Sequence, residues 1–204
     1  MGQLRCGYDF YKQDSVTVAK KLLGKLLVRK LGDEEIICKI VETEAYVGPE
    51  DKGSHAYQNR RTKRTEVMFE PGGYAYIFLI YGMYNCLNVV TNERDKPEAV
   101  LIRGIEPLKG IELIKKNRNI KSKKAADLTN GPGKLCEALA IEKDLNGYDL
   151  ISGDQLYIKE ADEKIDFEIV SSKRINIDYA EEYKEKLWRF YIKNNPFVSV
   201  ILKD

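Results

Sequence analysis

The chain has 204 residues, enough for one domain to bury a substantial core without disulfides or a bound metal. Its 34 basic residues nearly balance its 32 acidic residues, and the net charge of +2 excludes a uniformly basic nucleic-acid binder, so any such affinity must come from local clusters. Four scattered cysteines without a CxxC pair, beside one histidine, argue against a zinc site and favour free, mostly buried thiols in a reducing compartment.

The sequence contains no candidate for a targeting or membrane-spanning segment. Residues 1–5 lack the long apolar stretch of a signal peptide. The most apolar stretch, residues 74–90, is rich in tyrosine and is interrupted by Gly82, Asn85 and Asn88. We therefore expect no membrane partner. We also expect a monomer, without a metal or a cofactor.

A helix and paired strands are predicted for the first half of the chain. Asp14 or Ser15 can cap a helix that runs to Leu23 and ends at Gly24. Strands are expected at residues 25–31, 35–46, 74–81, 84–90 and 99–105. Turn residues between the first two strands, and again between the next two, predict two β-hairpins.

The second half of the chain mixes both kinds of element. An apolar pattern predicts a helix over residues 107–117, and Gly131-Pro132-Gly133 precedes a short helix over residues 134–141. The tail from Gln155 is strand-like, most clearly at residues 188–192 and 198–201. This order predicts an α+β fold: a single domain, residues 1–204, built on a curved antiparallel β-sheet with surrounding helices and a protruding β-hairpin.

The segment from Val41 to Asp51, followed by His55, carries the strongest sign of a functional site. Side chains alternate faces along a strand, so Glu42, Glu44 and Tyr46 share one face, and the smaller residues between them share the core face. The polar stretch after Tyr46 reads as a long loop, the usual place for binding residues. A purely structural explanation also exists, because most strand carboxylates are solvated and a single histidine is more often structural than catalytic.

Basic residues gather in two places. One cluster directly follows the candidate site and consists of Arg60, Arg61, Lys63 and Arg64. The other lies within residues 115–124. Either can be an ordinary solvated face, but the first is the better candidate for contacts with a nucleic-acid backbone because it adjoins the site.

The glycine-rich segment before Lys134 is not a nucleotide-triphosphate loop. Leu128 stands where the first glycine of that motif belongs, and Leu135 stands where serine or threonine belongs. A helix N-terminus at this point can still hold one backbone phosphate, with Lys134 as a further candidate contact.

An aromatic hairpin is expected at residues 74–88. Tyr81 precedes the turn glycine and has the opposite strand parity to Tyr76 and Phe78, so its ring can project while the other two face the opposite side. An exposed ring at a hairpin tip suits a wedge between DNA bases, and enzymes that act on a base in a duplex must extrude that base. Packing in the core is the alternative for Tyr74 and Tyr76.

Five blocks in this order closely resemble the alkyladenine (3-methyladenine) DNA glycosylase family, the mammalian-type family that also occurs in bacteria. The blocks are Val41 to Asp51; Ile80-Tyr81-Gly82-Met83-Tyr84 with Asn88; residues 101–108, read LIRGIEPL; residues 131–136, read GPGKLC; and Arg189-Phe190-Tyr191. Together they run over nearly the whole chain.

The resemblance implies a role for each matching residue. Glu44 matches the catalytic acid that deprotonates and orients the attacking water, and Arg103 matches the arginine that helps to hold that water. Tyr46 and His55 match two sides of the pocket for a flipped base.

Three residues of the hairpin also match family positions. Tyr81 matches the residue that intercalates where the base has left, and Asn88 matches the asparagine that disfavours normal guanine through its exocyclic amine. Phe78 stands where some members have a tyrosine stacking on the base. The ring face is retained, but any contribution of a hydroxyl is lost.

The implied activity is that of a monofunctional DNA glycosylase on double-stranded DNA. It would remove alkylated or deaminated purines (3-methyladenine, 7-methylguanine, hypoxanthine, ethenoadenine) with an activated water and leave an abasic site. A carboxylate beside C1′ suits this chemistry because it stabilises the sugar cation and activates water. The expected location is the cytoplasm, at the nucleoid, in a bacterium and the nucleus in a eukaryote.

Two other functions stay open on the sequence. A non-catalytic module that binds damaged DNA or RNA would also use the aromatic hairpin and the basic loop, but it has no need of a buried acid beside an arginine. A hydrolase of free nucleosides would leave Tyr81 and the arginine cluster without a purpose.

Overall fold

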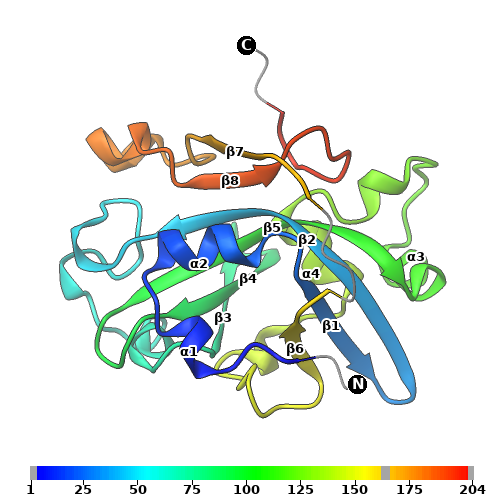
Figure 1. Ribbon diagram of the computed structural model, residues 1–204, viewed down its shortest axis with the longest axis horizontal. Helices are drawn as coiled ribbons and strands as arrows, with labels where there is room; N and C mark the ends of the chain where they lie inside the picture. The colour runs from blue at the N-terminus through cyan, green and yellow to red at the C-terminus, as the bar shows by residue number, and fades with distance from the viewer. Residues whose placement is uncertain (1–3, 162–165, 202–204) are drawn as a thin grey trace.

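The computed structural model describes residues 4–161 and 166–201, so the predicted domain ends at residues 1 and 204 lie outside the described residues. The described residues form one α+β domain around a curled antiparallel sheet, as the sequence predicts (Figure 1). The strands are β1 (Leu26–Leu31), β2 (Glu34–Tyr46), β3 (Ala75–Ile80), β4 (Tyr84–Thr91), β5 (Glu98–Lys109), β6 (Leu156–Lys159), β7 (Ile169–Ser172) and β8 (Arg189–Ile192). The α-helices are α1 (Tyr8–Tyr11), α2 (Ser15–Leu22), α3 (Ile111–Arg118) and α4 (Pro132–Ala138).

The long strand β2 organises the sheet. Neighbouring strands follow the order β3-β4-β5-β2-β1-β6, and β8 joins β2 and β7 off this path. Along one edge, β2 pairs first with β1 and then, from Glu42 to Glu44, with β8; along its other edge it pairs with β5. Register shifts next to Glu42 mark a β-bulge, which bends the strand where it changes partner.

Helix α2 covers one face of the sheet, while α4 lies on the opposite side in Figure 1. Asp14 caps α2 by accepting a hydrogen bond from the Thr17 amide at 2.9 Å, which confirms the predicted cap. Val41 and Ala45 enter the main core, and the Thr43 hydroxyl donates to the Ala19 carbonyl of α2 at 2.9 Å. The predicted core face of β2 is therefore confirmed, which leaves its other face for the site.

Two predicted elements differ from the structure. Residues 107–109 belong to β5 and not to a helix, because Pro107 and Lys109 pair with β2. Helix α3 begins only after Gly110, whose φ of 80° and close approach to the Glu35 carbonyl leave no room for a Cβ. Residues 198–201 form no strand, although β7 and β8 confirm a strand-like tail before them.

Helix α4 also lies slightly off its prediction: it starts at Pro132 and ends at Ala138. Short 3-10 turns complete the fold at Gly48–Glu50, Tyr57–Asn59, Glu66–Phe69, Ala125–Leu128, Lys143–Leu145 and Asp178–Glu185. All four cysteines are buried and carry free thiols.

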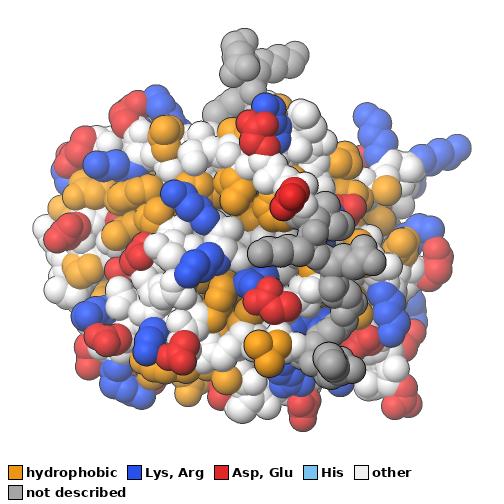
Figure 2. All heavy atoms as spheres, in the orientation of Figure 1, with side chains coloured by type: hydrophobic (Ala, Val, Ile, Leu, Met, Phe, Trp, Pro, Cys, Tyr) orange, Lys and Arg blue, Asp and Glu red, His pale blue; other side chains and the backbone are white. Residues whose placement is uncertain are grey.

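The surface agrees with the balanced composition. On the face drawn in Figure 2, acidic and basic side chains are interspersed with apolar ones. No helix among the described residues has both the length and the apolar character needed to cross a membrane.

Candidate active site

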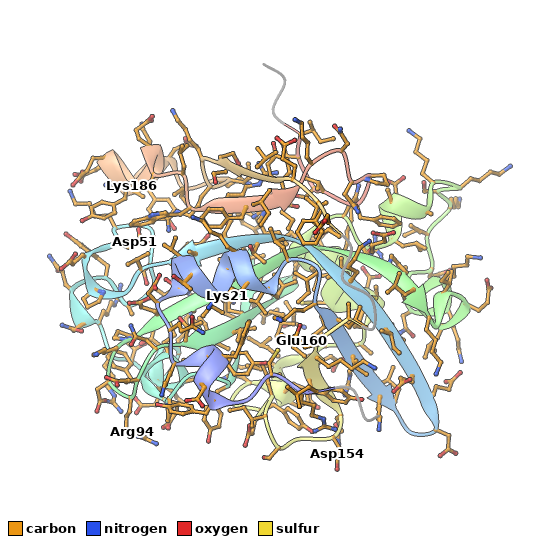
Figure 3. The ribbon with its side chains drawn as sticks, viewed as in Figure 1. Lys21, Asp51, Arg94, Asp154, Glu160 and Lys186 are labelled. Atoms are coloured by element: carbon orange, nitrogen blue, oxygen red, sulfur yellow. The ribbon has the colours of Figure 1, made fainter. Side chains whose placement is uncertain are left out.

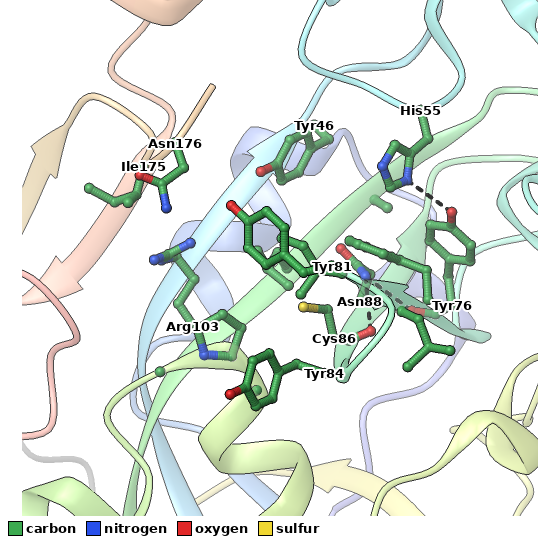
Figure 4. Close-up of a pocket in the computed structure, with 18 of the residues that line it drawn as sticks. Tyr46, His55, Tyr76, Tyr81, Tyr84, Cys86, Asn88, Arg103, Ile175 and Asn176 are labelled. Carbon is green, nitrogen blue, oxygen red and sulfur yellow. Dashed lines mark hydrogen bonds between the residues drawn. The ribbon is translucent and has the colours of Figure 1, made fainter. Parts of the chain in front are cut away.

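Of the seven residues predicted for catalysis, base binding and intercalation, six line one pocket of about 900 Å³ on the sheet face opposite α2 (Figure 4). They are Tyr46, His55, Phe78, Tyr81, Asn88 and Arg103. The seventh, Glu44, lies directly behind Tyr46 and Arg103 and contacts both. Strand pairing explains the gathering, since β2, β5, β4 and β3 are consecutive neighbours in the sheet.

Glu44 is fully buried and is held from three sides. The Ile175 amide donates to Oε1 at 2.8 Å, while the Tyr46 hydroxyl and Arg103 Nη1 donate to Oε2 at 3.0 and 3.4 Å. Burial, and next the carboxylate of Glu44, raise the pKa of Tyr46 well above its ordinary value, so the hydroxyl stays a donor. The arrangement fixes a carboxylate directly behind two residues that line the pocket, Tyr46 and Arg103.

Arg103 of β5 bridges two carboxylates of β2, those of Glu42 and Glu44. Its Nε donates to Glu42 Oε1 at 3.3 Å, on the other side from its contact with Glu44. Burial lowers the pKa of Arg103, but the charges of Glu44 and Glu42 outweigh that effect and leave the pKa raised. The guanidinium is thus a fixed cation beside Glu44.

Glu42 anchors a second arginine that sequence reasoning missed. Arg189 of β8 has no exposed surface, and its Nε donates to Glu42 Oε1 at 2.7 Å. The Ser199 amide and hydroxyl also donate to the Glu42 carboxylate, at 2.6 and 2.9 Å. Two hints were present in the sequence: Glu42 shares a strand face with Glu44, and Arg189 belongs to the last of the five blocks that resemble the family.

One wall of the pocket is an aromatic recess. Tyr76 and Phe78 of β3 lie 5.6 Å apart between ring centroids, and the His55 imidazole meets Phe78 edge-on at 4.5 Å. Arg64 Nη2 lies 3.3 Å from His55 Nε2, and the Tyr76 hydroxyl lies 3.0 Å from Nδ1. Because arginine only donates, Nε2 accepts and Nδ1 carries the proton. Burial, and next the charge of Arg64, lower the pKa of His55 to about 4, so the ring is neutral at pH 7.

Comparisons with known proteins show the family of the chain. Residues 9–196 match the methylpurine-DNA glycosylase family (MPG). The chain belongs to that family. A relative from Natranaerobius thermophilus is 58% identical over 97% of this chain and 100% of its own length. Relatives from Clostridium perfringens (strain SM101) and Clostridium novyi are 51% and 52% identical over 96% of the chain, covering 99% and 98% of their own lengths.

All three relatives carry the name "Putative 3-methyladenine DNA glycosylase". The resemblance seen in the five sequence blocks is therefore confirmed, and the chain is a member of a family of DNA glycosylases, enzymes of DNA repair.

The hairpin of this methylpurine-DNA glycosylase family member ends in exposed apolar side chains. Tyr81 is 73% exposed and Met83 is 68% exposed. Tyr81 has a φ of 53°, which is uncommon for an aromatic residue, and such strained positions cluster at functional sites. Strand alternation predicts Tyr81 and Phe78 on opposite sides, yet both line the same pocket because the chain leaves the strand after Ile80.

Contacts at the base of the hairpin fix its direction. Gly133 of α4 packs so closely on the Tyr84 side chain that an added Cβ would lie 3.0–3.2 Å from it. Asn88 is buried, and its amide nitrogen donates to the Tyr76 carbonyl at 3.1 Å. These contacts hold β3, β4 and α4 around one side of the pocket.

The residues predicted to contact the DNA backbone differ in the structure, because some of their side chains already have partners within the protein. Arg61 is already paired with Glu66 and Asp95, at 2.7 and 2.9 Å. Lys134 lines the pocket and bonds Asn130 Oδ1 at 2.7 Å. The remaining members of the loop cluster, Arg60, Lys63 and Arg64, are exposed and have no acidic partner among the described residues.

A buried ion pair behind Tyr46 is the second feature that sequence reasoning missed. Arg174 and Asp51 are buried, and two guanidinium nitrogens reach the two carboxylate oxygens at 2.5 and 2.8 Å. The Arg174 guanidinium lies between the rings of Tyr46 and Trp188, at 4.8 and 5.0 Å from their centroids. In Figure 3, Asp51 lies below the segment that carries Lys186.

Within the described residues, no group of three or more histidine, cysteine, aspartate or glutamate side chains is placed to hold a metal ion.

Proposed function

We propose that this protein is a monofunctional DNA glycosylase of base excision repair. It flips alkylated or deaminated purines out of double-stranded DNA, hydrolyses the N-glycosidic bond with an activated water and leaves an abasic site. The observation that carries the proposal is the fully buried Glu44, which contacts two residues that line the aromatic pocket, Tyr46 and Arg103. A carboxylate that is buried next to a pocket is a candidate catalytic group, because a carboxylate with no functional role is usually solvated.

Glu44 and Arg103 act on water in this mechanism. The Glu44 carboxylate takes a proton from the attacking water, and its negative charge stabilises the positive charge that builds on deoxyribose. Arg103 is held by Glu42, so it keeps its position next to Glu44 and helps to orient the water. No amine nucleophile takes part.

The aromatic residues bind the flipped base. Tyr46 and Phe78 offer ring faces for stacking, His55 offers its backbone amide to the base edge, and Asn88 disfavours the exocyclic amine of normal guanine. Base–aromatic stacking contributes roughly 1–3 kcal/mol per base. Tyr81, exposed at the hairpin tip, fills the space that the base leaves in the duplex.

Basic side chains hold the DNA backbone in the proposal. These are Arg60, Arg61, Lys63, Arg64 and Lys134. Arg60 and Lys63 are the freest of the five, since Arg61 already carries two ion pairs. The protein acts as a monomer with one catalytic domain, residues 1–204, and we place it in the cytoplasm at the nucleoid because its substrate is DNA and the relatives are bacterial.

The test is single-turnover excision from duplex oligonucleotides that carry one hypoxanthine or one 7-methylguanine. The wild type should give strand breaks only after alkali, and Glu44→Gln should give none. Borohydride should trap no covalent adduct, because only an amine nucleophile forms a Schiff base. Tight lesion binding without breaks would instead favour the non-catalytic binding module, and activity on free inosine would favour the nucleoside hydrolase.

A further inference from the structure

Most of the arginine charges around the pocket are compensated by carboxylates. Three arginines line it, and two of them have a carboxylate partner: Arg103 pairs with Glu42 and Glu44, and Arg118 pairs with Glu137. Arg64 is the arginine without such a partner, because no acidic side chain among the described residues lies within ion-pair distance of it. Lys134 also lines the pocket, and its ammonium contacts the neutral side chain of Asn130. The positive charge of Arg64 therefore acts on whatever occupies the pocket, without a neighbouring carboxylate to neutralise it.

The Arg64 guanidinium lies against the aromatic recess formed by His55, Tyr76 and Phe78. Its guanidinium carbon lies 5.1 Å from the centroid of Phe78, and Nη2 contacts His55 Nε2 at 3.3 Å. On the other wall, Arg174 lies 4.8 Å from the centroid of Tyr46. Both rings proposed to stack on the base thus already have a cation against them, which weakens their attraction for a cationic base.

The two kinds of purine lesion respond oppositely to a fixed positive charge. When the bond between C1′ and N9 breaks, its electron pair leaves with the base. A base that is cationic in DNA, such as 7-methylguanine, leaves as a neutral molecule. A base that is neutral in DNA, such as hypoxanthine, leaves as an anion unless it is protonated. A nearby cation stabilises that anion and repels a base that is already cationic.

His55 does not supply the missing proton. Its Nδ1 proton lies against the Tyr76 hydroxyl and its Nε2 faces Arg64, so both ring nitrogens are engaged. The lowered pKa of His55, about 4, agrees with a neutral ring. Support for the departing base therefore has to come from another group of the pocket, and Arg64 is the cation that contacts both His55 and the Phe78 ring.

We propose that Arg64 determines the lesion preference: its uncompensated charge favours purines that are neutral in DNA and leave as anions over purines that are already cationic. The proposal rests on the proposed function, and it assigns Arg64 a role beyond contact with the DNA backbone.

The experiment measures single-turnover rate constants, at saturating enzyme, for duplexes with hypoxanthine and with 7-methylguanine. The observable is the ratio of the two rate constants. In Arg64→Gln the ratio of hypoxanthine to 7-methylguanine excision should fall by roughly three- to tenfold, the scale of one partly solvated charge acting on both substrates. Arg64→Lys keeps the charge and should retain most of the ratio.

Arg60→Gln is the matched control, since it removes the same charge from the same loop without a contact to the aromatic recess. It should change both rate constants by a similar factor and leave the ratio in place. Thermal unfolding of the variants checks folding, and Arg64→Met gives a second neutral side chain.

An unchanged ratio in both neutral variants, with excision still measurable, overturns the role of Arg64 and leaves the proposed function intact. Equal losses of the ratio in Arg64→Gln and Arg60→Gln also overturn it, because the effect would then belong to the loop charge in general. Failure of the wild type to excise either base counts against the proposed function itself.

Discussion

Arg174 and Asp51 form a buried, two-pronged ion pair that joins three segments of the candidate site. Arg174 also donates to the Ala45 carbonyl at 3.1 Å, and the next residue, Ile175, donates its amide to Glu44. Asp51 accepts from the amides of the loop that leads to His55, including Gly53 at 2.9 Å. One pair therefore sets the end of β2, the binding loop and the segment over Glu44.

Removal of one member of this pair should destabilise the fold. Arg174→Leu leaves Asp51 charged and buried, and such a loss typically costs about 3–5 kcal/mol. Urea unfolding measures the change. Lys173→Gln is the control, because the neighbouring Lys173–Glu185 pair is more than half exposed and should contribute less than about 1 kcal/mol. Equal losses of stability from the two substitutions would contradict a structural role for the buried Arg174–Asp51 pair.

Glu42 and Glu44 should differ in what they support. Glu42→Gln removes the countercharge of the fully buried Arg189 and should lower the free energy of unfolding by about 3 kcal/mol or more. Glu44→Gln should abolish excision with a smaller loss of stability, because Arg103 keeps Glu42 as its partner. Urea unfolding and single-turnover excision, measured on the same samples, separate the two effects. A stable, active Glu42→Gln variant would refute the assignment.

Tyr81→Ala should weaken binding to lesion DNA more than binding to undamaged DNA. The ring is 73% exposed, so its loss should change stability by less than about 0.5 kcal/mol. Binding is measured in the Glu44→Gln background, which prevents turnover, and Met83→Ala serves as the control at the same tip. Equal losses of affinity for lesion and undamaged duplexes would count against a wedge.

His55 should make stability fall at mildly acidic pH. Its folded pKa of about 4 lies below the unfolded value near 6.5, so the unfolded chain binds more protons between these values. The contribution is full above about pH 6.5 and is lost as the pH falls toward 4. His55→Gln cannot titrate, and it is a clean probe because the chain has one histidine. Its urea midpoint should decline less than that of the wild type between pH 7 and 4.5; identical declines would mean that His55 is not held neutral.

Local patterns predicted the fold well where strands are joined by short turns. The hairpins β1–β2 and β3–β4 follow from their turn residues, and the core face of β2 follows from alternation. The helix predicted over residues 107–117 failed at its start, because apolar spacing is similar in a helix and in a strand end. Pairing with β2 decided the outcome at Pro107, and no local feature encodes that pairing.

The site shows the same division. Glu44, Tyr46 and His55 lie close together in sequence, and the remaining predicted residues lie on neighbouring strands, so the pocket could be anticipated. The ion pairs could not: Arg174 is 123 positions from Asp51, and Arg189 is 147 positions from Glu42. The sequence does not distinguish an arginine that will be buried from an exposed one, because its acidic partner lies on a distant segment.

The partners of Glu42 also determine when the site can exist during synthesis. Arg189 and Ser199 come from the last stretch of the described chain, whereas Glu42 is made early. Until that stretch leaves the ribosome, a carboxylate at the centre of the sheet lacks its main donors. A prematurely terminated chain would therefore lack β8 and the donors that Arg189 and Ser199 give to Glu42, so such products should be inactive as well as prone to degradation.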